Sequence, residues 1–110
     1  MASTCTRPRS TDDDVSEHAV IVTRMVVHAD AVDRACAVFR AMQDDVRAQE
    51  PGTVFYAYYQ ADDDPTVFWV HEVFADAAAK QFHLGNHAHR RADFDAILAQ
   101  PPEFHMVHEL

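Results

Sequence analysis

Glycine is scarce in this sequence, where Gly52 and Gly85 are the only two glycines among 110 residues. Phosphate-binding loops need several glycines close together, because only then can backbone N–H groups approach the anion. The scarcity therefore argues against P-loop and dinucleotide-binding folds. Cysteine is equally rare: Cys5 lies in a polar stretch and Cys36 in a helical pattern. Two such cysteines do not make a disulfide framework, which favours a reducing compartment.

Basic residues are also few, with nine Lys and Arg against 18 Asp and Glu and a formal net charge of −9. This charge repels phosphate backbones and anionic head groups, so it argues against nucleic acid and membrane surfaces as partners. No segment approaches the roughly 20 apolar residues of a membrane span, and the polar N-terminus lacks the apolar core of a signal peptide. We expect a soluble, cytoplasmic protein. Small neutral or cationic molecules are still compatible with this charge as ligands.

The length fits one domain, and a hydrophobic content of 48% suffices for a small core. Residues 1–18 are rich in Ser, Thr, Asp, Arg and Pro without periodic apolar positions, which predicts a disordered N-terminal tail. The folded domain is then expected over residues 19–110.

Within that domain, β-branched and aromatic runs predict strands over residues 19–28, 53–60, 67–75 and 103–110. A helix capped by Asp30 is expected to end near residue 49, because apolar residues recur there at intervals of three and four: Val32, Ala35, Phe39, Met42 and Val46. Asp76 is expected to cap a short helix that Gly85 closes, and Asn86 to cap another that ends before Pro101.

The order strand, helix, strand, strand, broken helix, strand is typical of the split βαβ arrangement of ferredoxin-like folds. This α+β fold has an antiparallel sheet with its helices on one face. The third strand, VFWVHEVF, is nevertheless apolar on both faces. Large exposed apolar patches are rare, so we expect a second copy of the chain to cover the bare face under two-fold symmetry.

A set of residues within this arrangement resembles the antibiotic biosynthesis monooxygenase (ABM) family, which includes the quinol monooxygenases. The residues that carry the resemblance are Glu50-Pro51-Gly52, Tyr56, Asp64-Pro65, Phe68, Glu72, Phe74, Asp76 and His83. The resemblance implies a dimeric α+β barrel and a small oxygenase that works without flavin, haem or metal. Its substrates would be molecular oxygen and an electron-rich quinol or a polyketide-like aromatic ring.

The resemblance also assigns candidate catalytic residues. His83 would be the general base, since a histidine can exchange a proton near neutral pH. Tyr56 would hydrogen-bond the quinol or enolate oxygen. Glu72 is a carboxylate at a position where the strand pattern predicts burial, so it needs a partner. An ion pair with Arg24 on the neighbouring strand is expected. For each of these residues a purely structural role is the alternative.

The substrate-binding candidates are Trp69 and Phe74, whose rings suit the walls of a pocket, together with Arg24 and His87. His83 and His87 are four residues apart, so with Glu72 they could form a two-histidine, one-carboxylate metal site. Gly85 and Asn86 are expected to break the helix between them, and we therefore expect no metal.

Two further alternatives concern the function itself. Haem-degrading relatives use a strand tryptophan, a helix histidine and an asparagine on the first strand, and the first strand here has no asparagine. Haem degradation is therefore disfavoured. The main competing hypothesis is a dimeric barrel that binds or isomerises a small metabolite without oxidising it.

Overall fold

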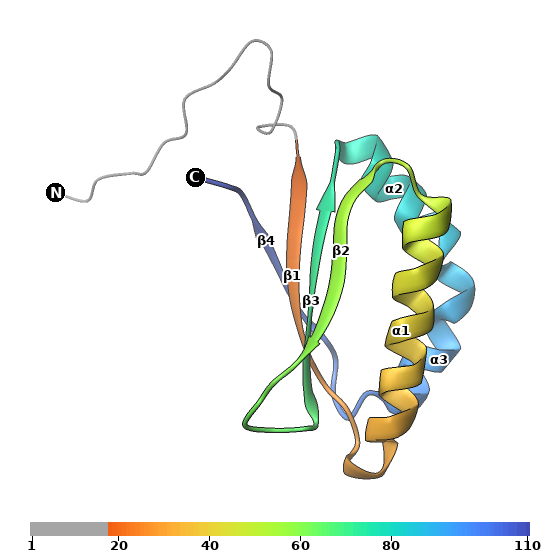
Figure 1. Ribbon diagram of the computed structural model, residues 1–110, viewed down its shortest axis with the longest axis vertical. Coiled ribbons are helices and arrows are strands. Elements are labelled where there is room, and N and C mark those ends of the chain that lie inside the picture. Colours follow the sequence, from red (N-terminus) through yellow and green to blue (C-terminus); the bar gives the residue numbers. More distant parts are fainter. Residues whose placement is uncertain (1–17) are drawn as a thin grey trace, which may run out of the picture.

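The computed structural model of the protein describes residues 18–110, so the predicted tail lies almost entirely outside the described residues. Four strands form one antiparallel sheet in the order β2-β3-β1-β4, and the helices lie on one side of it (Figure 1). The elements are β1 (Ala19–Val26), η2 (Ala29–Ala31), α1 (Val32–Gln49), β2 (Thr53–Gln60), β3 (Val67–Phe74), α2 (Ala77–Asn86), η3 (Ala88–Arg90), α3 (Arg91–Ile97) and β4 (Glu103–Val107). This is the predicted ferredoxin-like α+β fold.

Three details of the predicted helices are wrong. Asn86 does not cap a further helix, because it is the last residue of α2 and Arg90 is the residue that precedes α3. Asp30 does not cap α1, because a 3₁₀ turn precedes the helix and its N-terminus has no side-chain cap. Gly85 does not close α2, which continues to Asn86. A glycine inside a helix costs only about 1 kcal/mol, which tertiary packing outweighs. The Asp76 cap is confirmed: its carboxylate accepts a hydrogen bond of 2.8 Å from the Ala79 N–H.

The main core lies between the sheet and α1. Phe39 of α1 stacks on the ring of Tyr58 with centroids 4.5 Å apart and meets Phe68 edge-on at 5.1 Å. Around this aromatic contact pack the other buried members of the core: Met25, Val27, Ala35, Met42, Val46, Tyr56, Val70 and Ile97. The aromatic cluster fixes α1 over β2 and β3.

The short helix α2 packs against the turn that joins α1 to β2. The Ala75 N–H donates to the Gly52 carbonyl at 2.9 Å, and a Cβ added at Gly52 would lie 2.8 Å from the Cβ of Ala79. Real Cβ atoms do not approach so closely, so position 52 admits only glycine with α2 in this place. The glycine is required by packing, since its φ is not positive.

The sheet face opposite the helices carries apolar side chains from three strands. Val73 lies opposite Val20 and Phe55, and Trp69 lies opposite Tyr59. Phe55 and Tyr59 are 42% and 48% exposed. None of the described helices is both long and apolar enough to cross a membrane.

We expect this face to bind a second copy of the chain, giving a homodimer of twice the chain mass by light scattering at micromolar concentration. Val73→Asp places a charge among these apolar side chains and should shift the protein towards monomer or unfold it. Ala78→Asp, on the exposed first turn of α2, is the matched control and should leave the mass unchanged. A monomeric native protein would contradict the expectation.

The two glycines provide a matched test of how α2 is held. Gly52→Ala should lower the free energy of unfolding by about 1–3 kcal/mol, as overpacking does, because the new methyl group forces α2 away from the turn. Gly85 lies inside α2, and a Cβ added there would have no neighbouring atom from the rest of the protein within 4 Å. Gly85→Ala should therefore raise the free energy of unfolding by about 0.5–1 kcal/mol. Urea denaturation measures both changes. Equal effects of the two substitutions would show that α2 does not depend on the close contact.

Candidate functional site

Four ionisable side chains are buried together where α2 faces the sheet. Glu50, Glu72, His83 and His87 are between 4% and 7% exposed. Burying such groups is costly unless they pair with one another. These four residues therefore form the candidate functional site.

Three different segments supply these residues. Glu50 follows the last residue of α1, and its N–H donates to the Val46 carbonyl at 3.0 Å. Glu72 lies on β3 with its side chain on the face that α2 covers. His83 and His87 are one turn apart, since the His87 N–H donates to the His83 carbonyl at 3.2 Å. The docking of α2 on the α1–β2 turn brings the three segments together.

The carboxylate of Glu50 is the centre of the hydrogen-bond network. It accepts from Thr53 Oγ1 at 2.8 Å, from His83 Nδ1 at 2.9 Å and from His87 Nε2 at 2.5 Å. Asn86 Nδ2 donates to it at 3.2 Å. Burial alone raises the pKa of Glu50, but the hydrogen bonds from Thr53 and Asn86, with His83 beside it, lower the pKa below its usual value.

His83 lies between two carboxylates. Its Nδ1 contacts Glu50, and its Nε2 is 3.3 Å from Oε1 of Glu72. Burial by itself lowers the pKa of His83, but Glu72 and Glu50 together raise it. For His87 burial dominates and lowers the pKa, although Glu50 opposes the shift. The two histidines therefore differ, because their surroundings raise the pKa of His83 and lower the pKa of His87.

Two tyrosine hydroxyls border this network. The hydroxyls of Tyr56 and Tyr58 are 2.7 Å apart, and the ring of Tyr56 is 5.4 Å from that of His83. Burial raises the pKa of both tyrosines far above the usual value. Both therefore keep their protons. One hydroxyl donates to the other, which leaves one O–H free to donate to a ligand.

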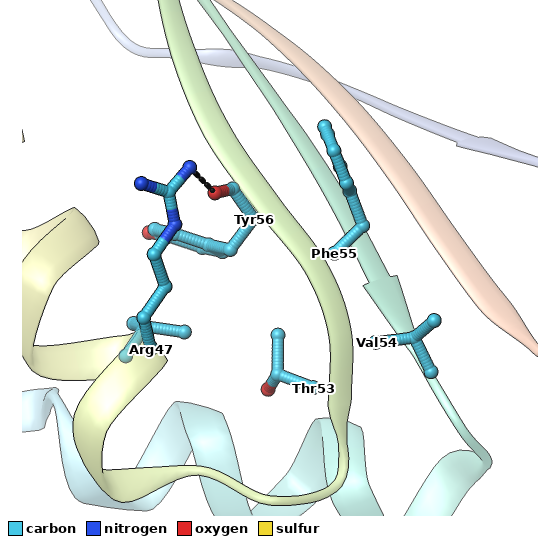
Figure 2. Close-up of a pocket in the computed structure, with 6 residues that line it drawn as sticks. Arg47, Thr53, Val54, Phe55 and Tyr56 are labelled. Carbon is cyan, nitrogen blue, oxygen red and sulfur yellow. Dashed lines mark hydrogen bonds between the residues drawn. The ribbon is translucent and has the colours of Figure 1, made fainter.

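A pocket of about 250 Å³ adjoins the network at the edge of the sheet. Figure 2 shows its lining: Arg47 of α1 donates at 3.0 Å to the Tyr56 carbonyl, and Thr53 lies between this pair and the turn. Because Thr53 also donates to Glu50, the pocket comes within one side chain of the buried carboxylate. A second pocket, of about 440 Å³, lies at the other end of α1 beside His28 and Arg34.

The structure brings together five of the seven predicted site residues: His83, Tyr56, Glu72, Phe74 and His87. The rings of Phe74 and His83 are 5.1 Å apart. Trp69 and Arg24 lie on the opposite face of the sheet, where they are register partners.

The predicted ion pair between Arg24 and Glu72 is wrong. Glu72 lies opposite Ile21, and alternate residues of a strand point to opposite faces, so Arg24 points away from it. Arg24 instead pairs with Glu103 of β4 at 3.2 Å.

Glu50 was not among the predicted site residues, although it begins the Glu-Pro-Gly turn. One signal could have identified it. The C-terminus of a helix carries partial negative charge, so a glutamate directly after α1 is electrostatically unfavourable. Such a residue needs a positive or hydrogen-bonding partner elsewhere, and the histidines of α2 provide it.

Several known structures have a similar fold. Provisionally named antibiotic biosynthesis monooxygenases from Bacteroides thetaiotaomicron and Caulobacter crescentus both match with a TM-score of 0.80, at 17% and 21% identity. The alignments cover 87% and 86% of this chain and 92% and 91% of those chains. One from Nitrosomonas europaea matches with a TM-score of 0.78 at 20% identity, over 86% of this chain and 91% of that one.

The comparison with curated proteins gives no match. The model of the antibiotic biosynthesis monooxygenase family matches residues 19–93, which span β1 to the start of α3 and include every residue of the buried network. The chain therefore belongs to the antibiotic biosynthesis monooxygenase family.

Proposed function

We propose that the protein oxidises an electron-rich quinol or polyketide-like hydroxyaromatic compound with molecular oxygen, without a flavin or haem. The observation that carries the proposal is the pairing of a buried carboxylate and histidine, Glu72 and His83, beside two tyrosine hydroxyls that keep their protons. Membership of the family supports an ABM-type role.

The chemistry needs a proton acceptor and an oxyanion donor. Both nitrogens of His83 already face carboxylates, so the base is the Glu72–His83 pair rather than His83 alone. One oxygen of Glu72 pairs with His83 Nε2 at 3.3 Å, and the other oxygen takes the substrate's hydroxyl proton. The free O–H of the Tyr56–Tyr58 pair donates to the oxyanion that forms.

The substrate then supplies all the electrons. For a quinol, one oxygen atom of O₂ forms a bond to a ring carbon. The O–O bond breaks, and the second oxygen leaves as water with two hydrogens of the substrate. The product is a hydroxyquinone, and the four electrons that O₂ takes up come from the ring. The protein contributes deprotonation, orientation and exclusion of water.

A second candidate is a barrel that binds or isomerises a small metabolite without oxygen chemistry. One observation favours it: neither of the two pockets described above is lined by Glu72 or His83. Oxygen consumption separates the two functions.

His83→Ala should lower the rate of quinol oxidation about 100-fold or more, since a positioned proton-transfer group contributes roughly 10²–10⁴. Oxygen uptake with hydroquinones and naphthoquinols, corrected for spontaneous oxidation, measures the rate. His28→Ala removes an exposed histidine at the other end of α1 and should be neutral. A fully active His83→Ala protein would make His83 structural. If the native protein consumes no oxygen with any quinol, the binding function is favoured.

The tyrosines have an internal control on the same strand. Tyr56→Phe and Tyr58→Phe should each lower kcat, towards the 10²–10³-fold typical of a lost oxyanion donor. The double variant should lower kcat by less than the product of the two single fold-reductions, because the hydroxyls share one chain of hydrogen bonds. Tyr59→Phe removes a hydroxyl from the opposite face of β2 and should leave kcat unchanged. Equal rates for all three single variants would exclude a role for the pair.

A further inference from the structure

The hydrogen-bonding pattern of His87 calls for an explanation that the proposed oxidation does not supply. Its Nε2 contacts Glu50, but its Nδ1 is buried and has no hydrogen-bond partner among the described residues. A buried polar atom without a partner costs about 1–3 kcal/mol. The contact of Nε2 with Glu50 therefore has to offset the cost of burying the unpaired Nδ1.

We propose that Glu50, His83 and His87 form a binding site for a divalent transition-metal ion of the zinc type, with one carboxylate oxygen and two imidazole nitrogens as protein ligands. The three ligand atoms lie within 4.8 Å of one another, and all three residues are buried. Bonds of about 2.1 Å to one ion hold tetrahedral ligands about 3.4 Å apart, so shifts of about an ångström suffice.

The surroundings of the three residues match those of known metal centres. A metal-bound histidine usually donates its other ring N–H to a carboxylate. Here His83 Nε2 faces Glu72 at 3.3 Å while its Nδ1 faces the proposed ion. Thr53 and Asn86 hold the Glu50 carboxylate in the same way. His87 lacks such an outer partner, which makes it the less firmly oriented ligand.

Charge supports a divalent ion. Glu50 and Glu72 bring two carboxylates into the core, and one divalent cation matches their combined charge. The net charge of −9 also attracts cations towards the protein. The ligand set of two nitrogens and one oxygen suits zinc and its neighbours in the first transition row better than magnesium or calcium.

The sequence suggested a different ligand set, in which Glu72 was the carboxylate. The expectation of no metal site assumed that the helix breaks at Gly85. Because α2 continues to Asn86, the two histidines stay one turn apart. Glu50, rather than Glu72, is the carboxylate that contacts both.

The ion would join the end of α1 to α2. Glu50 directly precedes the Pro51–Gly52 turn, His83 lies in the helix that packs on that turn, and His87 is the C-cap of the same helix. Metal binding should therefore stabilise the fold by linkage, raising the melting temperature with metal concentration. His83 belongs to both sites, but the inference rests on the ligand geometry and not on the proposed oxidation, and metal binding can be measured without substrate.

Calorimetric titration tests the site. Full-length protein treated with EDTA and dialysed should bind one Zn²⁺ per chain, and its melting temperature should rise. Glu50→Gln and His87→Gln should each weaken binding by more than the roughly 10–100-fold typical of a lost outer partner, while Glu72→Gln should fall within that range. His28→Gln, which removes an exposed histidine at the other end of α1, should bind as the native protein does.

A spectroscopic measurement on the unaltered protein covers the case in which a variant does not fold. Nitrogen NMR of the histidine rings should show Zn²⁺ shifting Nδ1 of His83 and Nε2 of His87. Shifts confined to other histidines, the same affinity in the Glu50→Gln and His87→Gln proteins, or the absence of one-to-one binding would overturn the proposal. All these measurements omit the substrate, so their outcome is separate from that of the oxidation assay.

Discussion

The buried carboxylate of Glu50 is the interaction on which the rest of the site depends. A single charged group directly after α1 accepts hydrogen bonds from the start of β2 and from three residues at the C-terminal end of α2. Without these donors the carboxylate would be an unpaired charge in the core, which costs several kcal/mol. The same contacts orient His83 towards Glu72, so the stability of the α1–β2 turn and the geometry of the site have one origin.

The sequence predicted the fold well because its signals are local. The period of Val32, Ala35, Phe39 and Val46 defines α1, and the run from Thr53 to Gln60 becomes β2 with the predicted bounds. Strand alternation alone also implies that Tyr56 and Tyr58 share one face of the sheet and that Trp69 and Glu72 do not. Each of these inferences needs only the neighbours of a residue along its own element.

Contacts between distant segments were harder to predict. Arg24 and Glu72 are both charges in apolar strands, and pairing them was reasonable until the register placed Ile21 opposite Glu72. Glu50 received no role because its histidine partners lie more than thirty residues away in the sequence. Gly85 misled for a related reason, since local propensity predicts a helix end where packing of α2 maintains the helix.

Two of the helices on the sheet, α1 and α2, are held by different forces, and this affects how a ligand reaches the site. Phe39 fixes α1 through aromatic packing, whereas α2 is held by the close approach at Gly52 and by the hydrogen bonds of His83 and His87 to Glu50. Opening the site by moving α1 would break the apolar core. Moving α2 would break mainly polar contacts, which water and a polar ligand can replace. Access to the buried pair of Glu72 and His83 therefore depends on the same contacts of α2 that define the site.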